Sequence, residues 1–333
     1  MNQLDLCNTI RNKPIRSGHH PRKLAVYTVI VDNYDEVKQP AIIDNRFDYI
    51  LFSNTHTNSV GVWKVRPIPL FTDKKWLLAR YPKLNPEIVM PEYDAWLYID
   101  GTIKITSQYV YDRCVELADA NVDWAGMKHQ ARNCIYDEIN AILAMSWVHD
   151  YEVQDWYKVM REDGFPAQAG LFENNIFFRT NSENVRKIDD MWRESISNFR
   201  FRRDQFSLMY AIWKHPTTKT TYLLPPGETA WNNNGHFSYY EHNPHQRNVK
   251  QTIWEKWRNR CCRACFNVDD GDIYHIYTDM FDILIPFKYP HVAMHVWTLY
   301  VSFRYGGKAL LGVIQRKTRK ALRYSAIEEK SSI

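Results

Sequence analysis

The chain has 333 residues, of which 45% are hydrophobic and 14% are aromatic. This length suffices for one large domain, or for one domain with an appendage, and the apolar content excludes a chain that is disordered throughout. The formal net charge of +5 is too small for a nucleic-acid-binding role to follow from the charge balance alone.

Polar and basic residues without periodicity occupy positions 1–22, and we expect a loose arm there. Asn85 and Pro86 are typical of a helix start, as N-cap and first helical residue, so a short helix is expected there. Nearly continuous apolar runs fit buried strands of a parallel sheet at three places: residues 23–31, 47–52 and 95–99.

From residue 107 onward, helical and strand patterns alternate. Helices are predicted where apolar residues recur at helical spacing: residues 107–120, 132–147, 182–196 and 203–214. Short strands are predicted between and after them: residues 122–129, 174–179 and 220–225. Alternation of this kind, without internal repeats, indicates an α/β sheet with crossover connections. We expect one such domain over residues 23–245.

The last third of the chain, residues 246–333, has a different character. Residues 283–303 are mostly apolar, but prolines, a lysine and two histidines interrupt them, which makes a poor membrane-spanning helix. Residues 304–324 carry seven Lys and Arg side chains and no acid. This pattern fits a helix that lies on an anionic membrane surface. A solvated terminal helix and a helix that binds a partner are the alternatives.

The residues Asp100, Gly101 and Thr102 directly follow the predicted strand 95–99. Ligands of open α/β sheets bind beyond the carboxyl ends of the strands. A carboxylate there can hold a hard divalent cation, a glycine lets a phosphate approach the backbone, and Thr102 offers a hydroxyl where a second acid often lies. Taken alone, the Asp-Gly pair favours a common turn over a binding site.

Further candidates lie at element junctions. Arg80 and Lys83 are cations suited to neutralise a diphosphate. Asp204 begins an apolar helix, where its carboxylate could orient an acceptor hydroxyl, act as a base or face an oxocarbenium ion, or simply stabilise the helix N-terminus. The remaining polar or flexible candidates are His129, Arg132, Gly170, Leu171, Glu173, Arg203, Gln205 and His236.

Six motifs occur in order: VYTVIVDNYDEVKQP, FDYILFSN, ARYPKLNPEIVMPEYDAWLYIDGTIKI, KHQARNCIYDEI, GFPAQAGLFENNIFFR and RRDQFSLMY. The region that they cover, about residues 24–215, resembles the glycosyltransferase-like domain first catalogued as domain of unknown function 616. That family includes plant turgor- and mucilage-related proteins and many bacterial polysaccharide-cluster proteins. The resemblance implies a GT-A-type fold, a nucleotide-sugar donor, and Mn²⁺ or Mg²⁺.

The resemblance also implies where the donor binds. Residues 29–34 and 52–54 would surround the nucleoside, and Arg80 would meet the diphosphate. Together with the residues at the strand tip, the expected nucleotide-binding set is Thr28, Tyr34, Asn54, Arg80, Lys83, Asp100, Gly101 and Thr102.

A looser resemblance to the family-8 transferases concerns the metal. Their corresponding strand ends in Asp-x-Asp, whereas the third position here is Thr102, so only Asp100 carries over as an acidic ligand. Another group would have to complete a metal site, and we name His236 as that second ligand.

The catalytic and substrate-binding residues are implied by two short patterns. His129 and Arg132 match the family's His-x-x-Arg pattern, and residues 203–205 match its Arg-Asp-Gln pattern. We expect three catalytic residues: Asp204, His129 and Arg132. We expect five substrate contacts: Gly170, Leu171, Glu173, Gln205 and Arg203.

These observations predict a glycosyltransferase that moves a sugar from a nucleotide-diphosphate donor to a glycan or glycolipid hydroxyl, in surface polysaccharide or glycan synthesis. A non-catalytic nucleotide-sugar- or glycan-binding module on the same fold is the alternative, because Thr102 replaces an expected acid. Nucleic acid is not an expected partner. Irregularly spaced cysteines and the lack of a secretory signal favour the cytoplasm, with peripheral binding to the inner membrane surface.

Overall fold

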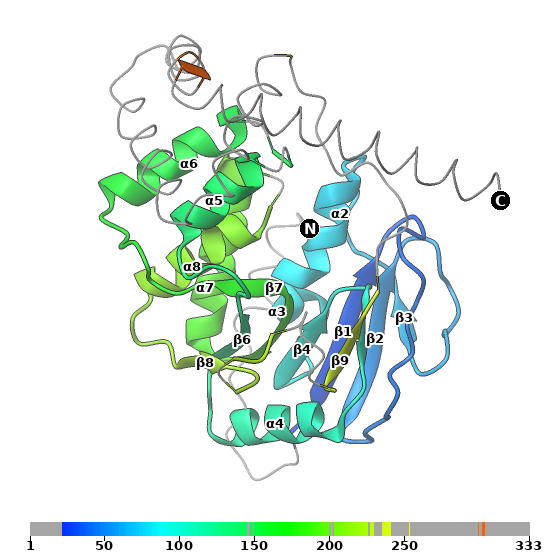
Figure 1. Cartoon of the computed structure of the whole chain (residues 1–333). Coiled ribbons are helices and arrows are strands. Elements are labelled where there is room, and N and C mark those ends of the chain that lie inside the picture. Colours follow the sequence, from blue (N-terminus) through cyan, green and yellow to red (C-terminus); the bar gives the residue numbers. More distant parts are fainter. Residues whose placement is uncertain are drawn as a thin grey trace, which may run out of the picture. The chain divides into compact units, whose positions relative to one another are not determined.

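The computed structural model describes residues 22–144, 147–148, 150–199, 201, 203–225, 227–229 and 235–240, and the single positions 253, 299, 302 and 303. The chain divides into two compact units, residues 1–135 with 168–245, and residues 136–167 with 246–333. All described strands belong to the first unit, and so do all the candidate site residues (Figure 1). The predicted domain boundaries near residues 23 and 245 stay predictions.

A seven-stranded mixed sheet forms the centre of the first unit, in the order β3-β2-β1-β4-β7-β6-β8. Its strands are β1 (Leu24–Ile30), β2 (Phe47–Ser53), β3 (Lys64–Arg66), β4 (Ala95–Ile99), β6 (Trp124–Lys128), β7 (Phe172–Thr180) and β8 (Thr220–Tyr222). Strand β7 is antiparallel to both of its neighbours, and every other pair is parallel. The beginning of β7 therefore lies at the same edge of the sheet as the carboxyl ends of β1, β2 and β4.

Among the described residues, the first unit has five helices: α2 (Lys75–Leu84), α3 (Pro86–Val89), α4 (Gln108–Asp119), α7 (Glu183–Phe199) and α8 (Gln205–Lys214). One face of the sheet packs with α4, because Val26 and Leu97 share an apolar cluster with Val110 and Leu117 of that helix. The side chains on this face are spaced two residues apart along the strands, as the pleat of a strand requires.

The opposite face of the sheet is aromatic. The ring of Phe177 stacks on Tyr98 and on Trp124, with both centroid distances at 5.0 Å. Trp192 of α7 meets Trp124 edge-on at 5.8 Å. Arg179, which is fully buried, places its guanidinium 5.3 Å from the ring centre of Trp124. Aromatic side chains of this layer contact the end of α2 and the residue before α8.

The described residues of the second unit form α5 (Ile135–Ala144) and α6 (Asp150–Glu162). The Tyr136 hydroxyl donates to the carbonyl of Phe165 at 2.8 Å, and Trp156 and Tyr157 of α6 are buried. No helix within the described ranges has the length and apolar character needed to cross a membrane. The predicted basic helix at 304–324 lies outside the described residues.

The prediction of a mixed sheet flanked by helices is confirmed. Every predicted strand is present, and so are the predicted helices between residues 85 and 214. Three short strands were not predicted, β3 and the antiparallel pair β5 (Ile103–Ile105) and β9 (Phe237–Tyr239). Helix α6 was not predicted either.

Candidate functional site at the carboxyl edge of the sheet

Asp100 lies immediately beyond β4, at the centre of the sheet. Its N–H donates to the carbonyl of Asn175 across the β4–β7 ladder at 2.8 Å, and its Oδ1 accepts from the Tyr98 hydroxyl at 2.5 Å. Loss of hydration raises the pKa of Asp100, and this effect exceeds the opposing effects of Lys83 and Tyr98. A rigid strand end thus holds one carboxyl group at the position where α/β sheets bind ligands.

Gly101 and Thr102 form the turn that follows Asp100. A Cβ on Gly101 would lie only 3.2 Å from Asp35 Oδ2 and Ile30 Cγ1, so the close approach of the loop after β1 favours glycine here. Thr102 is 2% exposed, and its carbonyl accepts from the N–H of Tyr240 at 2.8 Å. Thr102 therefore lies within the small β5–β9 ladder.

Lys83, near the end of α2, lies between two carboxylates. Its Nζ is 2.6 Å from Asp204 Oδ2 and 3.8 Å from Asp100 Oδ1. The ammonium also lies 4.6 Å from the ring centre of Tyr98, and only 8% of the Lys83 side chain is exposed. Residues from α2, β4 and the start of α8 therefore form one charged cluster, which we call the Lys83 cluster (Lys83, Asp100 and Asp204).

Asp204 directly precedes α8 but does not cap it, because its side chain makes no hydrogen bond to the helix N-terminus. The indole N–H of Trp192 donates to the Asp204 carbonyl at 2.6 Å and so fixes this turn. Burial opposes the ionisation of Asp204, but Lys83 and Arg80 outweigh it and hold the pKa of this carboxyl below its ordinary value. Asp204 therefore does not act as a hydrogen-bonding cap of α8, and its carboxylate is paired with Lys83 instead.

Arg80 is one helical turn before Lys83. Its Nη1 donates to the carbonyl of Trp76 at 3.0 Å, and its guanidinium lies 5.9 Å from the Trp76 ring centre. Its Nε is buried without a hydrogen-bond partner. Because Arg80 lowers the pKa of both Asp100 and Asp204, its positive charge acts on the same cluster.

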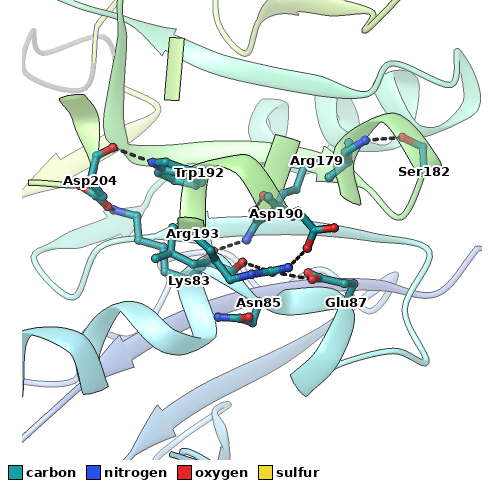
Figure 2. A network of polar contacts seen from close by, with 12 residues as sticks. Lys83, Asn85, Glu87, Arg179, Ser182, Asp190, Trp192, Arg193 and Asp204 are labelled. Carbon is teal, nitrogen blue, oxygen red and sulfur yellow. Dashed lines mark hydrogen bonds and ion pairs between the residues drawn. The ribbon is translucent and has the colours of Figure 1, made fainter. Parts of the chain in front are cut away.

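A polar network buried under α2 fixes the position of Lys83 (Figure 2). The Arg179 guanidinium donates to the Lys83 carbonyl and to Asp189. Arg193 donates to the carbonyl of Leu84 at 2.9 Å and to Glu87 at 2.7 Å. The last carbonyls of a helix have no partner within it, and here two arginines of β7 and α7 bind them.

Asn174 and Asn175 belong to the strand next to Asp100, and neither is among the predicted site residues. They lie in β7 where the pairing with β6 shifts, since Gly126 faces Phe177 but Met127 faces Glu173. Both asparagines are less than 10% exposed, and neither amide has a partner for its oxygen or its nitrogen. Bulges of this kind redirect side chains next to binding sites. The only sequence signal was a pair of asparagines entering an apolar strand.

The residues predicted to contact substrate converge on the start of β7. His129 N–H donates to the Leu171 carbonyl at 3.0 Å, and His129 Nε2 lies 3.6 Å from Glu173. Gln205 donates to the Phe172 carbonyl at 3.0 Å and lies 3.3 Å from the Arg203 guanidinium. Three segments that are distant in sequence thus meet here, as the prediction of a shared site requires.

His129 and Gly170 also shape this corner. The Nδ1 of His129 accepts from the N–H groups of Ala131 and Arg132 at 3.2 and 3.0 Å, so this ring closes the turn after β6. Gly170 has a φ of +94°, which favours glycine, and its N–H donates to the Asn133 carbonyl at 3.1 Å. The predicted catalytic roles of His129 and Arg132 stay predictions.

The predicted nucleoside region carries a pocket. After β1, Asp32 and Asn33 both adopt left-handed backbone torsions, and Asp32 exchanges hydrogen bonds with Asn54 at 2.8 and 2.6 Å. A pocket of about 420 Å³ lies beside this turn, lined by Asn33, Asp35, Glu36, Val37, His56 and Val60. Tyr34 closes the turn through its N–H to the Val31 carbonyl at 3.0 Å.

Thr28, the remaining predicted nucleotide contact, lies inside β1 two residues before the strand ends. It is 3% exposed, and its hydroxyl has no hydrogen-bond partner. The side chain is thus part of the strand interior, and its assignment to the nucleotide stays a prediction.

The residues at the strand end do not fit the Mn²⁺ or Mg²⁺ that the resemblance implies. His236 Nδ1 lies 3.0 Å from Ser107 Oγ, its Nε2 lies 3.4 Å from Glu228, and its ring stacks on Tyr109 at 4.7 Å. An ammonium, not an open space, lies between Asp100 and Asp204. Among the described residues, no three His, Cys, Asp or Glu side chains form a group that could hold a metal ion.

No family model matches this chain, and no curated protein does. Among solved structures it is similar to the bifunctional glycosyltransferase WbbM, with 12% identity and a TM-score of 0.38 over 63% of this chain and 40% of that one. It is also similar to an active-site mutant of LgtC, with 10% identity and a TM-score of 0.37 over 60% of this chain and 72% of that one. Both similarities concern the fold alone, and membership of the family named above stays a prediction.

Proposed function

We propose that the chain is a glycosyltransferase that transfers a sugar from a nucleoside-diphosphate donor to a hydroxyl group of a glycan. The observation that carries the proposal is that the side-chain amides of Asn174 and Asn175 are buried without partners in the strand next to Asp100, whose N–H donates to the Asn175 carbonyl. Buried polar groups in a folded protein normally have partners, so unpartnered amides in this strand suit a ligand rich in hydroxyls, such as a sugar.

The rest of the donor has complementary surroundings. The pocket beside Asn33 and His56 suits the nucleoside, and the Arg80 guanidinium suits the diphosphate. In the reaction, the acceptor oxygen bonds to the anomeric carbon, the bond from that carbon to the diphosphate oxygen breaks, and the acceptor proton leaves. Asp204 is the carboxylate that we assign to the reacting centre. Catalysis arises mainly from positioning and from stabilising the leaving diphosphate.

The proposal is tested with a thermal-shift panel of UDP-, GDP-, CMP- and dTDP-sugars, followed by assays of donor hydrolysis and transfer. We expect one donor class to raise the melting temperature and to be turned over. Asp100→Asn and Asp204→Asn should each lower turnover by about a hundredfold or more with the circular dichroism spectrum unchanged. Stabilisation without turnover would indicate the binding-module alternative, and no stabilisation by any donor would refute the proposal.

A further inference from the structure

We propose that Lys83 is the resident cation of this site: its ammonium takes the place between the two carboxylates that a divalent metal ion would need, so the donor binds without Mn²⁺ or Mg²⁺. The exclusion of metal concerns the Lys83 cluster itself. Only the part about the donor rests on the proposed function.

The geometry of the Lys83 cluster supports this role of the lysine. The Lys83 Nζ lies 2.6 Å from an oxygen of Asp204 and 3.8 Å from an oxygen of Asp100. A magnesium or manganese ion that joined these two carboxylates would need a position about 2.0–2.2 Å from an oxygen of each. The ammonium already lies next to both oxygens, beside the place that such an ion would need. Two cations this close together would repel each other strongly in a site this poor in water.

Lys83 is also held in place by its neighbours. Its carbonyl accepts from the Arg179 guanidinium and from the Tyr27 hydroxyl, the latter at 3.3 Å. The next carbonyl, that of Leu84, accepts from Arg193. Only 8% of the Lys83 side chain is exposed, and its ammonium lies over the ring of Tyr98. The backbone is fixed by buried groups (Figure 2), and little of the side chain reaches solvent, so the ammonium is positioned by its surroundings.

The cations of this site also have hydrogen-bond donors left for a ligand. An ammonium has three N–H donors, so one lysine can serve both carboxylates and still donate to a phosphoryl oxygen. Arg80 adds a second cation to the same cluster. Lys83 and Arg80 can therefore bind a diphosphate directly, as cationic side chains do in many phosphate sites.

The experiment measures the binding of Mn²⁺ to the protein in the absence of any donor. Titration calorimetry and the electron paramagnetic resonance signal of the free ion are the two readouts. We expect the wild-type chain to bind no stoichiometric Mn²⁺ through Asp100 and Asp204. Lys83→Met should gain a site at least about tenfold tighter than any in the wild type, because two carboxylates then lack a cation. Lys83→Met combined with Asp100→Asn should lose the gained site.

Lys187→Met is the matched control, because it removes an exposed lysine paired with a glutamate, Glu183, far from the cluster in sequence. It should leave Mn²⁺ binding unchanged. Stoichiometric binding of Mn²⁺ by the wild type that disappears in Asp100→Asn would overturn the proposal. That comparison needs no Lys83 variant, so the test stands even if Lys83→Met does not fold.

The donor arm uses UDP and GDP, each with EDTA and with Mn²⁺. We expect the wild-type affinity to agree within about twofold between the two conditions, and Lys83→Met to lose about tenfold or more in EDTA and to recover part of it with Mn²⁺. A wild type that binds either nucleotide only with Mn²⁺ would overturn the inference. If neither nucleotide nor any donor sugar binds under either condition, the proposed function fails, whereas the Mn²⁺ titration still decides what Lys83 does.

Discussion

If the proposed function holds, Asn174 and Asn175 contribute to ligand binding at a cost in stability. Each amide is buried without partners, and an unsatisfied buried polar group destabilises a protein by about 1–3 kcal/mol. Their replacement by alanine removes that penalty along with the side-chain atoms. Stability and binding should therefore respond differently to the same substitution.

We expect Asn175→Ala to change the free energy of unfolding by less than about 1 kcal/mol and to weaken donor binding by about tenfold or more. Urea denaturation and donor titration measure the two quantities on the same preparation. Asn184→Ala is the matched control, because Asn184 donates to the Asp123 carboxylate at 3.0 Å. It should lose stability and keep its donor affinity. The reverse pattern would show that Asn175 serves the fold and not a ligand.

A second single-residue prediction concerns acid. The Arg46 guanidinium, with its backbone N–H and Gln108, lowers the pKa of Asp44 to about 2 from an ordinary 3.8. Because the folded pKa is the lower one, this carboxylate stabilises the fold fully above pH 4 and loses that effect as the pH falls toward 2. Asp44→Asn should cost about 2 kcal/mol at pH 7 and almost nothing near pH 2, as measured by urea unfolding at several pH values. A loss that does not depend on pH would contradict this assignment.

The sequence singled out the charged residues that the structure brings together, but not the neutral Asn175. Asp100, Lys83 and Asp204 were found because a charge next to an apolar run is rare and calls for a reason. That Lys83 would bridge both acids was not predictable, since it depends on the distance between α2, β4 and α8 in the fold. The burial of the Asn175 amide was not predicted, because it depends on a shift in strand pairing. The residue pattern of a single strand does not determine its pairing register.

The end of α2 shows how an element is positioned by groups outside it. Pro82 lies inside this helix, and Asn85 follows it with its side chain donating to the Tyr81 carbonyl at 2.7 Å. The next free carbonyls belong to Lys83 and Leu84, and they accept from arginines that belong to β7 and α7. Helix α2 therefore ends in a position that depends on buried charges in the other half of the sheet.

Arg179→Met tests this dependence. We expect the free energy of unfolding to fall by about 3–5 kcal/mol, because Asp189 would be left buried without its cation. The double variant Arg179→Met with Asp189→Leu should recover most of that loss, since two apolar side chains of similar size replace the pair. Both variants should bind donor more weakly than the wild type at temperatures where they are folded. Urea unfolding and donor titration separate the two effects, and a double variant that binds donor normally would show that α2 needs no such support.

Strand existence was predictable from the sequence, whereas strand direction was not. The apolar runs of β1, β2, β4 and β7 look alike, and nothing in a buried run tells which way it enters the sheet. The three-residue strands β3, β5 and β9 are too short to show a period. Helix α6 is different, because Val153, Trp156, Tyr157 and Met160 are spaced as one helical face and could have predicted it.

For the molecule as a whole, the basic stretch 304–324 gives a prediction that is independent of the donor site. A chain that ends at residue 303 should keep its donor affinity and lose binding to vesicles containing anionic lipid, because the seven cations of residues 304–324 are removed. Cosedimentation with neutral and anionic vesicles measures this, and binding by the full chain should fall as salt is raised. Failure of the full chain to bind anionic vesicles at low salt would favour a solvated or partner-binding tail.

The reversed strand β7 also has a consequence for how the chain folds. It inserts between β4 and β6, and its pairing joins residues 95–99 to residues 176–180, a contact between distant parts of the sequence. Such contacts form late, because a long loop must close before they are gained. The Lys83 cluster and Asn175 meet only once this insertion is complete and the chain has been synthesised past residue 204. Ligand binding therefore reports the last step of refolding, and a partly folded chain with most of its helices formed would still have no site.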